Sequence, residues 1–225
     1  MTTDVSPSTE PAGVRRERGP RLDADRLAST VRYYDRHAES YAASTRSIDT
    51  SERIQRFAAL LPPHGRVLDV GCGAGRDLLQ LGALGFEVSG LDISPALAAI
   101  ARRASRREVL VADLRTIDLP TEGFDGIWAM ASLLHLGRSE LPEVLLKLTS
   151  ALRPGGTLFA SVKRGVGEVV DGTGRWFTLH DEAGWRRRLV EAGLEVIELV
   201  GEPADAGAAT GTVAPGWISS LSRRP

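Results

Sequence analysis

The 225-residue sequence has little cysteine, few aromatic residues and no long hydrophobic run. Its single cysteine, Cys72, excludes an internal disulfide and indicates a reducing environment. No apolar stretch is long enough to span a bilayer, and the first residues contain no apolar segment of the kind that a secretory signal requires. The sequence therefore predicts a cytoplasmic protein with no membrane partner.

An excess of positive charge is also absent. Lys and Arg number 28, Asp and Glu number 29, and the net charge is -1. Non-specific binding of nucleic acid requires surplus positive charge, so this composition makes nucleic acid an unlikely partner. The arginines in 101–108 and 185–189 are interpreted as solvated helix faces. Cys72 has no cysteine or histidine at metal-ligand spacing, so no metal site is expected.

What the sequence does contain is a regular alternation of strand and helix patterns. Residues 1–22, rich in Ser, Thr, Pro and Arg, are predicted to be a disordered tail, and residues 23–225 a single domain. Helical patterns over 23–44 and 51–61 precede the alternation. The expected strands are 66–70, 87–92, 109–114, 124–131, 157–163, 194–200 and 216–223, and the helices between them are 76–84, 94–104, 139–152 and 181–193.

This order predicts an α/β fold with a Rossmann-like, doubly wound, seven-stranded sheet. The sheet is expected to be mostly parallel and to end in a C-terminal antiparallel hairpin, because no helix separates the last two strands. Ser94 and Ser139 are predicted to cap the helices that follow them. Ligands of such sheets bind at the carboxyl ends of the strands, so ligand-binding residues are expected at the ends of the first strands.

A glycine-rich loop, within VLDVGCGAGRD (67–77), joins the first strand of this alternation to a helix. Gly71, Gly73 and Gly75 tolerate positive φ and leave the backbone open to a ligand near the free N–H groups of a helix start. A dinucleotide loop has the spacing G-x-G-x-x-G, whose third glycine would fall where Arg76 stands. The spacing therefore disfavours a nicotinamide oxidoreductase.

Acidic residues close the first three strands. Asp69 suits a cationic group, and Asp92 can accept both hydroxyls of a ribose. Asp113 suits the exocyclic amine of an adenine, for which Ile93 and Leu114 would be apolar walls. A ligand with an amino-acid part, a ribose and an adenine is S-adenosylmethionine (SAM), which we predict as the cofactor.

Taken together, VLDVGCGAG, LDIS, ADL, FDGIWAMASLLHL and LRPGGTLFASVK resemble the motifs of the class I SAM-dependent methyltransferases, over roughly residues 31–200. The resemblance implies that the methionine end of SAM is held by the first acid and the glycine loop, in which the small Cys72 packs. It also implies that Ala129 lies near the transferred methyl group. The cofactor residues so implied are Asp69, Gly71, Cys72, Gly73, Gly75, Asp92, Ile93, Asp113, Leu114 and Ala129.

The N-terminal segment YYDRHAESYAASTR resembles the Y-D-x-x-A-x-x-Y helix of many small-molecule members. The resemblance implies that Tyr34, Tyr41 and Arg46 close over the cofactor. Tyr33, Tyr34 and Tyr41 are too close in sequence to share one helix face, so at least one is expected to be structural. Within the class, LLHL, SVKRG and GRWFTLHDE are most similar to bacterial methyltransferases of the tellurite-resistance type, a similarity that does not extend to the substrate.

Methyl transfer is an in-line displacement, for which the protein mainly aligns the acceptor. A general base is needed only if the nucleophile arrives protonated. His135, after the fourth strand, is the candidate base, with a capping or core role as the alternative, and Tyr34 is the second catalytic candidate. Lys163 could steer an anionic substrate or could be a solvated strand end. Arg175, Trp176 and His180 could wall the acceptor pocket, although Trp176 also fits a core position.

The predicted function is methyl transfer from SAM to a small-molecule acceptor by a monomer or homodimer. The fourth strand is followed by AMAS and not by the Asn- or Asp-Pro-Pro-aromatic motif of enzymes that methylate base amines. A tRNA or protein acceptor, or a non-catalytic SAM-binding protein, remains as an alternative. The sequence leaves the acceptor atom open.

Overall fold

The computed structural model describes residues 20–203 and 216–225. Residues 1–19 of the predicted tail, and residues 204–215 between the last two predicted strands, lie outside this part. The continuous helix predicted over 23–44 is wrong: the chain forms α1 (Pro20–Arg36) and α2 (Ala38–Thr45), because His37 leaves the helical conformation at φ -113° and ψ 18°. The part of the chain described contains no helix of sufficient length and apolar character to cross a membrane.

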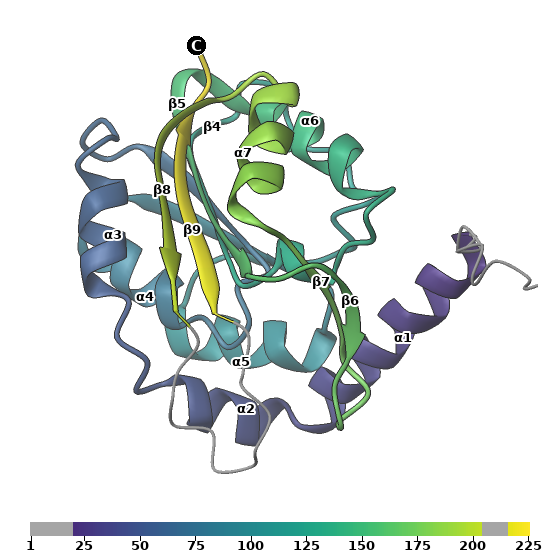
Figure 1. Cartoon of the computed structure of the whole chain (residues 1–225). Helices are drawn as coiled ribbons and strands as arrows, with labels where there is room; N and C mark the ends of the chain where they lie inside the picture. The colour runs from purple at the N-terminus through teal and green to yellow at the C-terminus, as the bar shows by residue number, and fades with distance from the viewer. Residues whose placement is uncertain (1–19, 204–215) are drawn as a thin grey trace, which may run out of the picture.

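The central sheet has seven strands in the order β3-β2-β1-β4-β5-β9-β8, as predicted in number and in type (Figure 1). Strand β9 runs antiparallel to both of its neighbours, and the other pairings in this sheet are parallel. The strands are β1 (Arg66–Val70), β2 (Glu87–Asp92), β3 (Val109–Val111), β4 (Phe124–Met130), β5 (Leu152–Lys163), β8 (Glu195–Glu202) and β9 (Trp217–Arg223).

Helices cover both faces of the sheet (Figure 1). Successive side chains of a strand point to opposite faces, so Val67 packs with one set of helices while Leu68 and Val70 pack with the other. One face carries α3 (Ser51–Ala58), α4 (Arg76–Ala83) and α5 (Pro95–Ser105), and the other carries α6 (Leu141–Ala151) and α7 (Glu182–Glu191). This is the doubly wound arrangement that the sequence predicts.

Of the two helix caps predicted from the sequence, the structure contains one and lacks the other. Ser94 caps α5 as predicted, since its hydroxyl accepts a hydrogen bond from the Leu97 N–H at 3.2 Å. Ser139 does not cap α6, because Glu140 takes the cap position and its carboxylate accepts from the Gly137 N–H at 2.8 Å. The helix expected over 139–152 ends at Ala151, but the next strand starts earlier than predicted: β5 begins at Leu152 and not at Thr157, with a register shift against β4 between Phe124 and Gly126.

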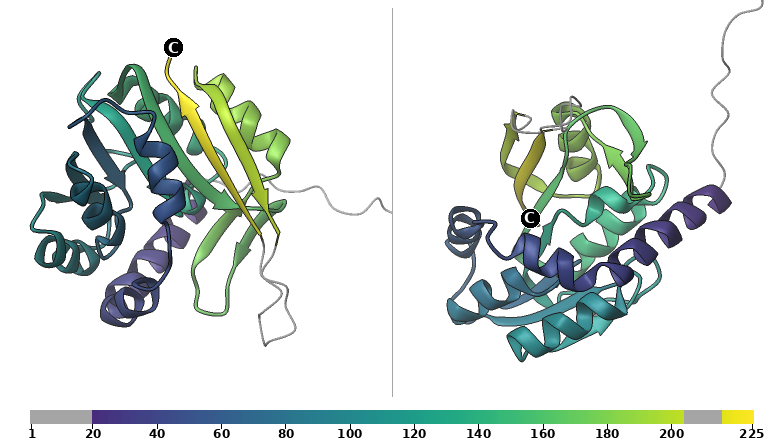
Figure 2. Two further views of the ribbon diagram at one scale, coloured as in Figure 1. Left: turned by 90° about the vertical axis from the view of Figure 1, so that its left-hand side faces the viewer. Right: turned by 90° about the horizontal axis from the view of Figure 1, so that it is seen from below.

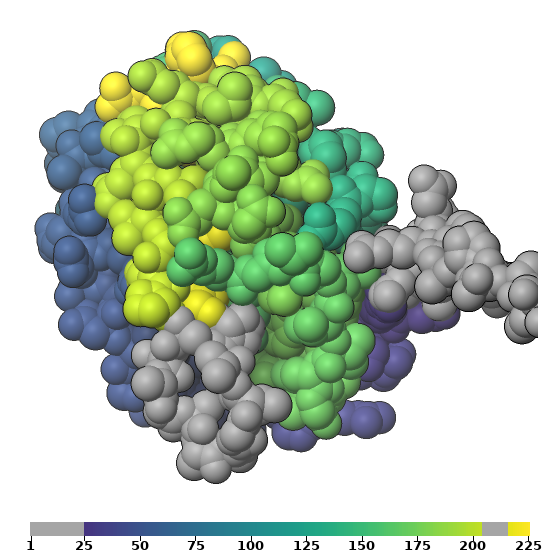
Figure 3. Space-filling model, viewed as in Figure 1, coloured from purple at the N-terminus to yellow at the C-terminus, as the bar shows by residue number. Residues whose placement is uncertain are grey.

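A two-stranded antiparallel hairpin, β6 (Gly167–Val170) and β7 (Trp176–Leu179), was not predicted. It lies outside the main sheet and packs beside α1 (Figure 3). The buried Thr30 hydroxyl of α1 accepts a hydrogen bond from the Trp176 N–H at 2.9 Å. Helices α1 and α2 lie beyond the carboxyl ends of the parallel strands (Figure 2), where they and the hairpin border the candidate site.

Candidate active site

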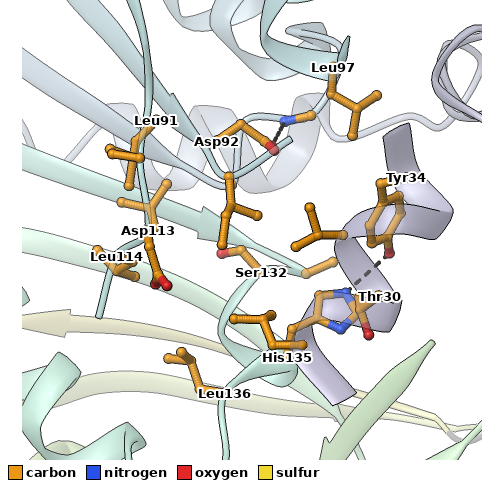
Figure 4. Close-up of a pocket in the computed structure, with 18 of the residues that line it drawn as sticks. Thr30, Tyr34, Leu91, Asp92, Leu97, Asp113, Leu114, Ser132, His135 and Leu136 are labelled. Carbon is orange, nitrogen blue, oxygen red and sulfur yellow. Dashed lines mark hydrogen bonds between the residues drawn. The ribbon is translucent and has the colours of Figure 1, made fainter. Parts of the chain in front are cut away.

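Two adjoining cavities lie at the carboxyl ends of the parallel strands. The first lies between α1 and the ends of β1, β2 and β3, and Asp92, Asp113 and Leu114 line it (Figure 4). The second extends toward β5 and β9, and Asp69 and Lys163 line it. The cavities meet at residues that line both, which are Tyr34, Tyr41, Gly71, Gly73, Ala131 and His135. The predicted pair Tyr34 and His135 therefore stands at the junction.

Glycine is required in the loop after β1 for two different reasons. Gly71, Gly73 and Gly75 all have positive φ, at +69°, +55° and +86°. A Cβ at Gly71 would also lie 2.4 Å from the Cβ of Ser132. A Cβ at Gly75 would lie 3.0 Å from the Ala101 Cα, and Gly75 does not line either cavity. Gly71 and Gly73 thus form the ligand side of the loop, while Gly75 lets α4 and α5 approach.

Asp69 is a buried carboxyl group at the second cavity. It is 2% exposed, and its Oδ2 atom has no hydrogen-bond partner. Burial, followed by the negative charge of Asp77, raises the pKa of Asp69 well above its usual range. A buried acid of this kind favours a cationic ligand group, because such a group would restore the interactions that the carboxylate lost on leaving water.

Asp92 is held by the backbone at the first cavity. Its Oδ2 atom accepts from the Gly73 N–H at 2.8 Å, the bond drawn at Asp92 in Figure 4. Its Oδ1 atom accepts from the Ser94 N–H, also at 2.8 Å. Burial raises the pKa of Asp92, although these backbone donors oppose the shift. Each oxygen retains a second lone pair, so the carboxylate can still accept hydrogen bonds from a pair of hydroxyls.

Asp113 has a partner that the sequence reasoning did not anticipate. It lies two residues beyond the end of β3, where its carboxylate accepts from the Arg115 guanidinium, with the shortest contact 2.6 Å from Nη2. Burial acts to raise the pKa of Asp113, but the hydrogen bonds from Arg115 lower it overall. Ile93 and Leu114 line the same cavity, as the adenine prediction requires.

The hydrogen bonds of His135 define its tautomer. Its Nδ1 atom lies 2.7 Å from the carbonyl oxygen of Trp176, which can only accept, so Nδ1 carries the proton. Nε2 therefore accepts from the Tyr34 hydroxyl, 3.1 Å away (Figure 4). Burial lowers the pKa of His135 from 6.5 to about 4, so the imidazole is neutral near pH 7. Burial also raises the pKa of Tyr34, which keeps that hydroxyl protonated.

Cationic and aromatic side chains border the second cavity. Arg175 pairs with Asp171 at 2.8 Å and lies over the ring of Tyr33 at 4.8 Å. The ammonium of Lys163 lies 4.0 Å from the centroid of the Phe177 ring. Cys72 also lines this cavity, but burial strongly raises the pKa of its thiol, so the residue packs and is not a nucleophile.

Besides Gly75, four predicted site residues lie away from the two cavities. Arg46 is exposed and does not line either cavity. Ala129 is fully buried among the residues packed under α6 and α7, because its side chain points to that face of β4. Trp176 is 1% exposed and belongs to the core, in line with its alternative reading. His180 is buried beside Trp185, in a separate hollow near α7.

Other residues of the site were missed by the sequence reasoning. Arg76 takes the place that Arg46 was predicted to fill, since it lines the second cavity and donates to the Thr45 carbonyl at 3.4 Å. Its position directly after the glycine loop could have identified Arg76 as a site residue from the sequence. Ala131 lines both cavities in a left-handed conformation, at φ 54°, which is uncommon for alanine and typical of functional sites. Trp217 reaches the cavity only through the pairing of β9 with β5, which no local pattern reveals.

Residues 67–156 match the family model described as a methyltransferase domain. By this match, the chain contains a methyltransferase domain. This domain includes β1 to β4, the glycine loop and most of the residues around the first cavity. The resemblance noted in the motifs is thereby confirmed.

Relatives of the methyltransferase domain act on different molecules. The chain is 35% identical over 116 residues to a ubiquinone biosynthesis O-methyltransferase of Xanthomonas axonopodis pv. citri, which covers 48% of each chain. It therefore spans about half the length of that relative. The fold is similar to 1,6-didemethyltoxoflavin-N1-methyltransferase of Burkholderia thailandensis, with a TM-score of 0.73, 20% identity and coverage of 97% and 94% of the two chains. It is also similar to a TehB-like methyltransferase of Corynebacterium glutamicum, with a TM-score of 0.64, 20% identity and coverage of 84% and 98%.

Proposed function

We propose that the protein binds SAM across the two cavities and transfers its methyl group to a small-molecule acceptor in the second. The observation that carries this proposal is the junction, where the Tyr34–His135 pair lines both cavities at once. A donor bound in one cavity and an acceptor bound in the other would meet beside this pair. Two of the proteins named above support the same class of acceptor, because their names refer to ubiquinone biosynthesis and to 1,6-didemethyltoxoflavin.

The residues present fit SAM. The unpartnered Oδ2 atom of Asp69 suits the ammonium of its methionine part, and Asp92 keeps lone pairs for the ribose hydroxyls. Ile93 and Leu114 offer apolar walls to an adenine. Asp113 is the weakest part of the fit, because Arg115 already occupies its carboxylate. When bound, SAM supplies a methyl group that is activated by the positive charge of its sulfonium.

Tyr34 and His135 would remove the proton from an acceptor that arrives protonated. The Tyr34 hydroxyl donates to His135 Nε2, and its oxygen accepts from Arg175 and keeps one further lone pair, which can take a proton from the acceptor. As that proton reaches Tyr34, the Tyr34 proton passes to Nε2, and the positive imidazolium is stabilised by its bond to the Trp176 carbonyl. General base assistance of this kind contributes about 100-fold or more to a rate.

The first experiment would be a methyl-transfer screen with SAM that carries a deuterated methyl group. The protein is incubated with a mixed metabolite extract, and mass spectrometry detects molecules that gain the labelled methyl. We expect a labelled small molecule. A labelled tRNA or protein instead would overturn the choice of acceptor class, and SAM binding without any labelled product would support a non-catalytic SAM-binding protein.

The pair is tested next by His135→Gln on the acceptor so found. We expect turnover to fall by about 100-fold, because a general base is removed, while SAM affinity measured by calorimetry changes less than about twofold. His64→Gln is the matched control, since His64 is exposed and lies outside both cavities. Equal turnover of the His135 variant and the wild type would reduce His135 to a structural residue.

A further inference from the structure

The cations around the second cavity differ in whether they have a counter-ion. Arg76 pairs with Asp77 at 2.7 Å and Arg175 with Asp171 at 2.8 Å. Arg53 pairs with Glu202, so its charge is also balanced. Lys163 is the exception within residues 20–203 and 216–225: its ammonium has neither an ion pair nor a hydrogen bond there. It lies over aromatic rings, at 4.0 Å from the centroid of Phe177 and 6.0 Å from that of Trp217.

The backbone of Lys163 is fixed, so the position of this charge is defined. Lys163 is the last residue of β5, and it pairs with Trp217 of β9. Its carbonyl oxygen also accepts a hydrogen bond from the His180 N–H at 3.0 Å. The side chain is partly buried and lines the cavity, where burial and the positive charge of Arg175 lower its pKa. An ammonium that has left water without a carboxylate partner favours an anion in the space beside it.

The charge also stands close to the proposed reaction centre. The centroid of the Phe177 ring is 4.0 Å from the Lys163 ammonium and 5.0 Å from the centroid of the His135 imidazole. Lys163, Phe177 and His135 thus lie next to one another in the wall of the second cavity. A ligand that lies on this wall would reach the ammonium with one group and the Tyr34–His135 pair with another.

We propose that the methyl acceptor carries an anionic group that Lys163 binds, while the atom to be methylated lies at the Tyr34–His135 pair. The proposal rests on the proposed function for the identity of the second cavity as the acceptor site. It names the acceptor class as an anion of carboxylate type with a flat apolar body, since aromatic rings form the wall. Lys163 is then the residue that sets charge specificity.

The test compares benzoate with benzamide, two probes of nearly equal shape that differ in charge. Ligand-observed NMR titrations with S-adenosylhomocysteine present give the dissociation constant of each probe. For the wild type we expect benzoate to bind at least 10-fold more tightly than benzamide. Lys163→Met should abolish this preference and Lys163→Arg should keep most of it, because arginine retains the charge.

Arg186→Met is the matched control, since Arg186 is exposed on α7 and lies outside both cavities. The preference of this variant for benzoate should equal that of the wild type. Equal affinity of the wild type for the two probes, or a preference that survives in Lys163→Met, would overturn the proposal. Because the titration requires no turnover, its outcome is independent of the methyl-transfer screen. A charge preference without methyl transfer would contradict the proposed function and leave an anion site at Lys163.

Discussion

Asp69 shows how one side chain can be unfavourable for the folded protein and favourable for its ligand. Its carboxyl group is buried beside Asp77, and one of its oxygens has no partner. The pKa of Asp69 is raised in the folded state, so the folded protein holds a proton that the unfolded chain releases above about pH 4. The free energy of unfolding therefore falls as the pH rises from there through the pKa of the folded state.

We expect Asp69→Asn to remove this loss of stability and to weaken SAM binding. The melting temperature of the variant should exceed that of the wild type by an amount that grows with pH, because the amide never ionises. SAM affinity should fall about 10-fold or more, the value of one charge-assisted hydrogen bond. Thermal unfolding and calorimetry between pH 5 and 8 measure both effects, with the exposed Asp118→Asn as the control. An unchanged SAM affinity would remove Asp69 from the cofactor site.

At the scale of elements, α1 depends on the hairpin β6–β7 for its position over the site. The Thr30 hydroxyl accepts from the Trp176 N–H and donates to the Arg26 carbonyl at 3.1 Å. The Ser29 hydroxyl donates to the Gly174 carbonyl at 3.2 Å, in the turn of the hairpin. The same hairpin supplies the carbonyl that fixes the His135 tautomer, so hairpin and helix together set the Tyr34–His135 distance.

Thr30→Val should therefore loosen α1, because it leaves the buried Trp176 N–H without an acceptor, at a cost of about 1–3 kcal/mol. We expect faster amide hydrogen exchange over residues 25–36 and slower methyl transfer. Thr30→Ser, which keeps the hydroxyl, should behave as the wild type does. Exchange rates in Thr30→Val that match those of the wild type would show that α1 is held by other contacts.

The elements also show what a sequence can predict and what it cannot. The three glycines and three acids were readable because they lie at or shortly after the ends of strands, and parallel strands of a doubly wound sheet end at one edge. The hairpin β6–β7 was not readable, since its strands are four residues long and its partner, α1, lies far away in the chain. Ala129 was misplaced because a strand-end motif gives the end of the strand but not the face to which each side chain points.

At the scale of the whole molecule, two buried histidines make stability depend on pH. Burial lowers the pKa values of His135 and His180 to about 4 in the folded protein, while both histidines of the unfolded chain take up protons below about pH 6.5. The stabilisation is complete above pH 6.5 and is lost as the pH falls toward 4, by at most about 1.4 kcal/mol per pH unit for each histidine.

Urea unfolding at pH 7, 6 and 5 should accordingly show the wild-type midpoint falling relative to that of His180→Gln, because Asp69 contributes equally to both proteins and only the wild type holds the second uncharged histidine. The variant keeps the Tyr34–His135 pair intact. His64→Gln should leave the slope unchanged, since His64 is exposed. Parallel slopes in wild type and His180→Gln would show that His180 takes up its proton in the folded state as readily as in the unfolded chain.

The order in which the chain builds its two cavities has a consequence for how such proteins diversify. The described residues of the first cavity all fall between Leu27 and Leu136, and every lining residue that comes later, from Ser161 to Ser219, belongs to the second cavity alone. The stretch that matches the domain family, 67–156, ends before that later group begins. A recombination point within α6 would consequently replace these later residues of the second cavity and leave the glycine loop and its three acids intact.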